Sequence, residues 1–227
     1  MASTAVDLAL LERWLCGWSL ARGAPLPRRE GGALVVEVGE PDQLRRHVYA
    51  SADAAFRECV AQISAPRIHV KAAVDAPTMR AALAPHWQLG EPRYLMRCAA
   101  PMPPSRDLPP GFIFRTTREH GARVIHACDP AGQLAASGRV VLRNGTAVFD
   151  RIDTLAPYRR RGLASALMLA LDALAVDACV AERLLVATEA GRALYTSLGW
   201  EVVSPYSSAL IPAAGTDFRQ RSAFRAA

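Results

Sequence analysis

The spacing of apolar residues in the first hundred positions predicts a helix followed by short strands and helices. Leucines and tryptophans recur at helical intervals over about residues 5–20. Runs rich in β-branched and aromatic residues follow, in the order ALVVEVG, RHVYA, RIHVKA and RYLMRCA. Two more helical stretches separate the later runs, one starting near Ser51 as its N-cap and one over residues 76–86. The first half therefore predicts the order α-β-β-α-β-α-β, a mixed sheet with helices on it.

The second half begins with four strand candidates in quick succession. They are FIFRTT, ARVIHAC, QLAASGRVVL and TAVFDRIDT, and the pair Asn144-Gly145 predicts a tight turn before the last of them. After Gly162 the apolar residues recur every three or four positions, which predicts an amphipathic helix to about Ala175. RLLVAT is then a continuous apolar run, typical of a strand buried on both faces.

A short helix and two strands are expected to complete this half. The segment EAGRALYTSLG is predicted to be helical and to end at Gly199, a suitable residue just past a helix. Strands are predicted over residues 200–203 and 208–211, and the polar tail after Pro212 is expected to fray.

A proline-rich stretch over residues 99–111 marks the clearest boundary. Its five prolines fix φ and remove amide donors, so neither a helix nor a central strand can form there. We therefore predict a smaller mixed α/β domain over residues 1–98, a stiff linker over 99–111, a second α/β domain over 112–212 and a flexible tail over 213–227.

The composition is that of an ordinary globular protein. Apolar residues make up 51% of the 227 residues and charged residues 21%, which allows a packed core and does not indicate disorder. No run of uncharged apolar residues is long enough to span a bilayer, and the N-terminus lacks the features of a secretory signal. The five cysteines are scattered without a C-x-x-C pair. We therefore expect free thiols in a cytoplasmic protein, with no metal and no membrane partner.

The basic residues give a formal net charge of +6. Almost all of them are arginines, since Lys71 is the only lysine, and they are scattered along the chain. A net charge of this kind bears on solubility and on weak attraction of anionic ligands, so binding of nucleic acid is not favoured. A nucleic-acid binder would instead show an affinity that falls steeply with salt.

The clearest chemical signal is the junction TLAPYRRRGLASAL, where a strand ends and a helix begins. The first amides of a helix have no internal partner, and the helix dipole adds positive potential there. Gly162 permits a close approach of the backbone, and Ala164 leaves the start of the helix uncrowded. With Arg159, Arg160 and Arg161 beside it, this turn suits a diphosphate.

These residues resemble a known signature. The pattern Arg-x-x-Gly-x-Ala at 159–164 resembles the (Gln/Arg)-x-x-Gly-x-(Gly/Ala) motif of the GNAT superfamily of N-acetyltransferases, and ALYTSLGW further along resembles that family's A-x-x-L-Y-x-x-x-G-(F/W) ending. The resemblance extends from about residue 112 to 211, where TAVFDRIDT and RLLVAT resemble the fourth and fifth strands. It implies a GNAT-like acyltransferase fold for the second half. The end of the first half also looks like a degenerate half of the same fold.

The resemblance further implies acetyl-CoA as the acyl donor. In this family the fourth and fifth strands splay apart, and the pantetheine arm lies in the slot between them, where main-chain groups pair with it as an added strand would. No Rossmann or Walker turn competes for the phosphate role. The implied coenzyme-binding residues are Asp153, Thr154, Leu155, Arg159, Arg160, Arg161, Gly162, Leu163, Ala164, Ser165 and Thr188.

Three departures from the family pattern are visible. Thr188 stands where many members have asparagine, and Val148 stands where a frequent glutamate acts as general base. Only REHG separates FIFRTT from ARVIHAC, so the two helices that commonly wall the acceptor site are missing. The first half is then the candidate source of that wall.

The implied mechanism is direct attack of an amine on the bound thioester, with no covalent enzyme intermediate. Tyr195 is the candidate general acid for the leaving thiolate. Asp150, Asp153 and Glu189 are candidate general bases, and the first two, three positions apart, are expected on opposite faces of a regular strand. Other sources of the base stay open, namely His120, His126 and a chain of water molecules.

Two function classes remain from the sequence. The first is an N-acetyltransferase that acts on a primary amine of a small molecule or protein. The second is a non-catalytic acetyl-CoA-binding regulatory module whose first half is the output surface. The acceptor is not determined, and neither is the oligomeric state, for which a homodimer is one candidate.

Overall fold

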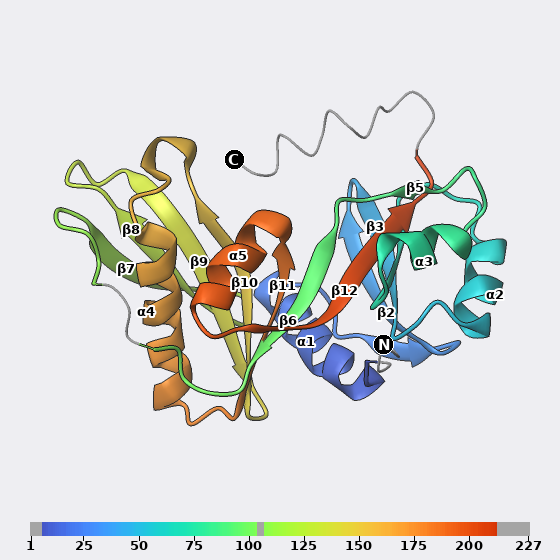
Figure 1. Cartoon of the computed structure of the whole chain (residues 1–227), viewed down its shortest axis with the longest axis horizontal. Helices are drawn as coiled ribbons and strands as arrows, with labels where there is room; N and C mark the ends of the chain where they lie inside the picture. The colour runs from blue at the N-terminus through green and yellow to red at the C-terminus, as the bar shows by residue number, and fades with distance from the viewer. Residues whose placement is uncertain (1–5, 104–106, 213–227) are drawn as a thin grey trace.

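The computed structural model describes residues 6–103 and 107–212, which share one mixed sheet of twelve strands (Figure 1). The predicted tail over residues 213–227 lies outside the described residues. The predicted mixed α/β class is confirmed. No helix in the described chain has the length and apolar character needed to cross a bilayer.

The first half has the predicted order of elements, with two short strands added. Its helix α2 is capped by Asp53 rather than Ser51, because the Asp53 side chain accepts a hydrogen bond from the Phe56 amide at 3.2 Å. The Ser51 hydroxyl instead donates to Asp53 at 2.8 Å. The elements are α1 (Leu8–Ala21), β1 (Arg28–Glu30), β2 (Ala33–Glu40), β3 (Gln43–Tyr49), α2 (Ala54–Gln62), β4 (Ile68–Ala72), α3 (Ala76–Ala81), β5 (Gln88–Leu89) and β6 (Arg93–Cys98).

The second half confirms the four strands, the long helix, the buried strand and the short helix. The prediction of two separate strands at its end is wrong, because residues 201–210 form one strand with a bulge between Val202 and Ser204. The elements are β7 (Ile113–Glu119), β8 (Ala122–Cys128), β9 (Leu134–Arg143), β10 (Thr146–Thr154), the short turn η1 (Ala156–Tyr158), α4 (Leu163–Asp177), β11 (Glu182–Thr188), α5 (Glu189–Ser197) and β12 (Glu201–Leu210).

The strands of the two halves interleave at the centre of the sheet. The strand order is β1-β2-β3-β4-β12-β6-β11-β10-β9-β8-β7, and the twelfth strand, β5, pairs with β12 outside this order. Strand β6 lies antiparallel between β11 and β12, and β12 continues past β6 to pair with β4. A strand of the first half therefore completes the sheet of the second half, and the last strand of the chain extends into the sheet of the first.

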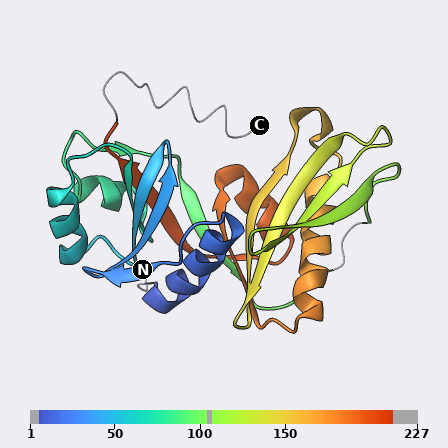
Figure 2. The ribbon, with the colours of Figure 1, turned by 180° about the vertical axis from the view of Figure 1, so that it is seen from behind.

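Helices cover both faces of this sheet. Helices α4 and α5 pack on one face of the second half, and α2 and α3 lie on the same side of the first half (Figure 1). Helix α1 packs on the opposite face, across the junction of the halves (Figure 2). Its Gly17 lies so close to β10 that a Cβ there would be 2.3 Å from Val148 Cγ2. We call the two sides the α4 face and the α1 face.

Candidate functional site

Strands β10 and β11 are parallel neighbours that part from one another, as the resemblance implies. They pair only over Thr146–Val148 and Glu182–Leu184, although β10 continues to Thr154 and β11 to Thr188. The outer edges of both strands pair with β9 and β6. Their inner edges beyond residues 148 and 184 therefore form a slot, whose main-chain groups can pair with an extended ligand.

The first half has no such slot. Its parallel neighbours β3 and β4 stay paired from Arg45–Ile68 to Tyr49–Ala72. Helix α2 follows β3, as α4 follows β10, but the Asp53 carboxylate occupies its N-terminus and would repel a phosphate. Only the second half therefore offers a coenzyme-like site in the described chain.

Helix α4 begins with an open N-terminus. No side chain caps it, whereas aspartate or threonine side chains cap the other four α-helices of the described chain. Its N-cap residue, Gly162, has a φ of 84°, a conformation that glycine adopts without steric cost. The free first-turn amides and the helix dipole then make this end a site for an anion.

The arginine-rich turn before α4 is fixed to the strands around it. The Nε atom of Arg159 donates to the carbonyl oxygen of Thr154 at 2.9 Å. The Tyr158 hydroxyl donates to Asp129 at 2.7 Å, and the Arg161 guanidinium lies 5.6 Å from the centre of the Tyr158 ring. These contacts hold positive charge beside the open helix end.

The other residues of the turn differ in what they could contribute. Arg160 is exposed and has a φ of 65°. The Leu163 side chain is 1% exposed and packs in the core, so only its amide could reach a ligand. Ala164 and Ser165 are partly exposed in the first turn of α4.

The rim of the slot carries one buried hydroxyl without a partner. Thr154 Oγ1 is buried and makes no hydrogen bond to the described residues. The Leu155 amide is already used, since it donates to the Ala135 carbonyl at 2.9 Å. The Thr188 hydroxyl accepts from the Gly191 amide at 3.0 Å and caps α5, which leaves its proton and one lone pair for a ligand.

Tyr195 lies in the core of the second half with 7% of its surface exposed. Its ring is folded back over Gly191, where a Cβ would come within 2.9 Å of Tyr195 Cε2. Burial first, and then the nearby Asp150 carboxylate, raises the pKa of Tyr195 well above its usual range, so the phenol keeps its proton. Gly191 was not among the predicted site residues, although its spacing of four from Tyr195 places the two on one helix face.

A bulge in β10 corrects the prediction about the two aspartates. Asp150 lies opposite Arg139 of β9 and Asp153 opposite Ser137, so the partners are two positions apart and both aspartates share the α1 face. The extra residue lies between them, where Arg151 has a φ of 50°. A regular strand would have placed them on opposite faces.

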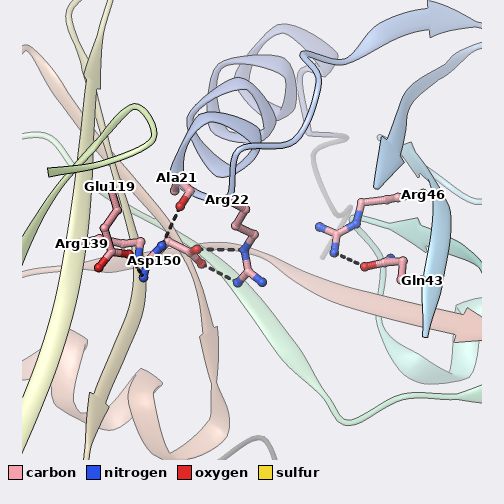
Figure 3. A network of polar contacts seen from close by, with 7 residues as sticks. All are labelled: Ala21, Arg22, Gln43, Arg46, Glu119, Arg139 and Asp150. Carbon is pink, nitrogen blue, oxygen red and sulfur yellow. Dashed lines mark hydrogen bonds and ion pairs between the residues drawn. The ribbon is translucent and has the colours of Figure 1, made fainter. Parts of the chain in front are cut away.

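The three candidate carboxylates have different partners. Both Asp150 oxygens accept from Arg22 at the end of α1, at 2.9 and 3.0 Å (Figure 3). Glu189 accepts from the Tyr94 hydroxyl at 2.6 Å, and this bond lowers the pKa of its carboxyl. Asp153 is partly exposed and has no hydrogen-bond or ion-pair partner within residues 6–103 and 107–212. Of the three carboxylates, Asp153 is therefore the one whose oxygens are not engaged by the described residues.

The remaining candidates for a base are placed differently. Val148 is 2% exposed and is covered by Gly17 of α1, so helix packing fills the position of the family's glutamate. His120 lies in the turn between β7 and β8, and His126 lies on β8, two strands away from β10. No group of three His, Cys, Asp or Glu side chains in the described chain could hold a metal ion.

Structural comparison places this arrangement among known folds. The chain is similar to a GCN5-related N-acetyltransferase from Kribbella flavida, at 13% identity and a TM-score of 0.63, over 94% of this chain and 98% of that one. It is also similar to a GCN5-related N-acetyltransferase from Sphaerobacter thermophilus, at 14% identity and a TM-score of 0.58, over 82% and 79%. A third similar structure is a tandem GNAT protein from the clavulanic acid biosynthesis pathway, at 15% identity and a TM-score of 0.51, over 82% of each chain. At these identities the likeness shows the fold alone.

The sequence itself identifies the family. No curated protein matches it. The profile of the acetyltransferase (GNAT) family matches residues 87–200, half of the chain, and this match contains the slot, the open end of α4 and Tyr195. The chain therefore belongs to the GNAT acetyltransferase family, whose members transfer acyl groups from acyl-coenzyme A.

Proposed function

We propose that this protein transfers an acetyl group from acetyl-CoA directly to a primary amine of a small-molecule or protein acceptor. The observation that carries the proposal is the uncapped N-terminus of α4 beside the slot between β10 and β11. The two features suit the two ends of one ligand, since the helix end binds anions and the open strand edges pair with amides.

The residues at the site fit the coenzyme. The amides after Gly162, with Arg159 and Arg161 beside them, would hold its diphosphate. The buried Thr154 hydroxyl lacks a partner on the slot rim and would gain one from the bound arm. When bound, acetyl-CoA supplies an acyl thioester that an amine can attack.

Proton transfer is assigned to two residues of the chain. Tyr195 keeps its proton because its pKa is raised, which suits a donor to a leaving thiolate. Asp153, the carboxylate without a partner, accepts the proton of the amine directly or through water. Both oxygens of Asp150 are held by Arg22, so we assign Asp150 to positioning the end of α1 against β10 and not to proton transfer.

The test of the coenzyme site is a melting shift with acetyl-CoA. At 100 times its dissociation constant the ligand should add about 2.7 kcal/mol, which is roughly 5–11 °C for a chain of this size. Gly162→Val, and separately the double variant Arg159→Glu/Arg161→Glu, should lose most of this shift. The matched controls are Gly132→Val and the double variant Arg115→Glu/Arg118→Glu. Gly132 has a positive φ, as Gly162 does, and a Cβ there would meet no neighbour. Both arginines are exposed on β7.

A shift that survives both site variants would mean that the site is wrongly placed. Turnover is tested by thiol release from acetyl-CoA in the presence of a panel of primary amines. Coenzyme binding without thiol release on any amine would reject the transfer reaction and favour a binding module.

A further inference from the structure

Four cations gather on the α1 face at the junction of the two halves. They are Arg22 at the end of α1, Arg46 on β3, Lys71 on β4 and Arg93 on β6, and we call them the basic cluster. Electrostatic coupling joins the members, since Arg46, Arg93 and Arg22 all lower the pKa of Lys71 after the larger effect of burial. None of the four belongs to the arginine-rich turn of the coenzyme site.

Strand register explains why these residues meet. Lys71 lies opposite Ser208 of β12, and Arg93 lies opposite Tyr206, two positions back on the same strand and on the same face. Arg46 lies two positions from Val48, which is the neighbour of Lys71. The interleaved strands β6 and β12 thus bring cations from three strands to one patch of sheet beneath α1.

The cluster has fewer acids than cations: in the described chain, Glu91 acts on Arg93 and Asp150 acts on Arg46. Asp150 is the one carboxylate of the described chain that pairs with a member, and Arg22 already occupies both of its oxygens (Figure 3). No hydrogen-bond or ion-pair partner of Lys71 occurs in the part of the chain that the structure describes. The only lysine of the sequence is therefore only partly exposed and lies among arginines whose charges lower its pKa.

Two buried polar atoms beside the cluster also lack partners. Arg46 is 7% exposed and donates to Gln43 at 3.0 Å, but its Nε has no acceptor. Tyr206 is 3% exposed, and its hydroxyl has no partner. Buried donors without acceptors are rare in folded proteins, and here they lie next to a concentration of positive charge. One anionic ligand would both accept from the unpaired donors and balance the positive charge.

Packing explains only part of the arrangement. The Arg46 and Arg22 guanidinium groups lie 3.7 and 4.8 Å from the centre of the Trp18 ring, a favourable cation–π geometry. Lys71 makes no such contact. Burial and neighbouring cations oppose its charge, so an apolar residue at this position would stabilise the fold. Groups whose charge is opposed by burial and by neighbouring charges cluster at functional sites.

The cluster lies on the α1 face of the sheet, the side of the slot away from the open end of α4. The open end of α4, which suits the diphosphate, belongs to the opposite layer of the sheet. Asp150 links the cluster to the reacting centre, because its carboxylate is coupled both to Arg46 and to Tyr195. A molecule bound at the cluster would therefore reach the slot from the side away from the coenzyme's phosphates.

We propose that the basic cluster binds an anionic group, a carboxylate or a phosphate, of the amine that accepts the acyl group. The assignment rests on the proposed acyl transfer for the identity of the ligand. Lys71 and Arg46 Nε are the donors to the anion, and Arg93, exposed on β6, is the outermost donor. The first half thus provides the acceptor site for the coenzyme site in the second.

Anion binding is tested first without coenzyme, by calorimetric titration of the full-length protein with inorganic phosphate and with succinate. Lys71→Met should weaken binding roughly tenfold to a hundredfold, the usual effect of losing one charged hydrogen bond. The same variant should melt at a higher temperature than the wild type when no anion is present. Arg93→Met is the second variant, and Arg118→Met, an exposed site on β7, is the matched control that should change neither result.

Acceptor choice is tested with matched amines that end in a carboxylate, a phosphate or a neutral amide. We expect kcat/KM to favour one of the two anionic amines over the amide, and Lys71→Met and Arg93→Met to reduce that preference. Unchanged anion binding in both variants, or an equal rate on the neutral amide, would overturn the proposal. If acetyl-CoA causes no melting shift but anions still bind, the proposed function is rejected and the anion site is retained. If acetyl-CoA causes the shift but anions do not bind, only the coenzyme site is retained.

Discussion

The substitution Asp172→Asn tests a buried ion pair at the closed end of the slot. Asp172 on α4 is 3% exposed, and Arg183 on β11 is 1% exposed. Arg183 Nε donates to Asp172 Oδ1, and the Met102 amide donates to Oδ2 at 2.7 Å. Arg183 lies opposite Ala147, within the three-residue stretch over which β10 and β11 pair, so this contact holds α4 against the closed end of the slot.

The expected loss follows from the charge left behind. Asparagine keeps the shape of the side chain but removes the negative charge, so the Arg183 guanidinium stays buried without a counter-ion. Breaking one side of a buried pair costs about 3–5 kcal/mol, a large share of the roughly 5–15 kcal/mol that stabilises a typical domain. For a chain of this length the melting temperature should fall by roughly 6–20 °C.

Urea unfolding followed by circular dichroism measures this loss. The double variant Asp172→Leu/Arg183→Met removes both charges and should be much less destabilised than the single variant, since apolar pairs often replace buried ion pairs at little cost. A loss below about 1 kcal/mol for Asp172→Asn would refute the reasoning. So would a double variant that is less stable than the single one.

Three further predictions concern the α5 side of the slot. Tyr195→Phe should lower kcat by about tenfold to a hundredfold, because a thiolate leaves readily and needs only modest help from an acid. The free energy of unfolding should change by less than about 0.5 kcal/mol, since the Tyr195 hydroxyl has no partner in the described chain. Gly191→Ala should lower kcat several-fold, because the new Cβ displaces the Tyr195 ring. The free energy of unfolding in urea should hardly change, since the gain of about 1 kcal/mol in helix propensity offsets the clash. An unchanged kcat would argue against the position of the ring. The raised pKa of Tyr195 means that the protonated acid persists as pH rises, so the alkaline fall of kcat that depends on Tyr195 should begin above about pH 10. A fall below about pH 9 that disappears in Tyr195→Phe would contradict this last expectation.

The coenzyme-like turn was predictable because its determinants are local. A strand, a basic turn, Gly162 and an amphipathic helix follow one another in the sequence, and the structure has them in that order. The fold class and the family follow from the same stretch. The positive φ of Gly162 was not part of that prediction, although glycine is the residue that adopts this conformation without steric cost.

The basic cluster and the shared face of Asp150 and Asp153 were not predictable, for two physical reasons. The position of β6 between β11 and β12 depends on pairing between residues about a hundred positions apart, which no local pattern encodes. The bulge at Arg151 changes the side of every later residue in β10 relative to simple alternation. The alternation of side chains along a strand therefore does not predict positions that depend on long-range strand pairing or on an inserted residue.

Strand β6 shows how the interleaving joins the two sites. Its adjacent residues Arg93 and Tyr94 point to opposite faces, Arg93 toward the basic cluster and Tyr94 toward Glu189 at the mouth of the slot. A slip of one residue in the pairing of β6 would exchange these two side chains and destroy both contacts. The register is held on both sides, since Arg93 lies opposite Thr188 of β11 and Tyr206 of β12. The strand that the first half contributes to the sheet of the second thus sets the position of the basic cluster relative to the slot between β10 and β11.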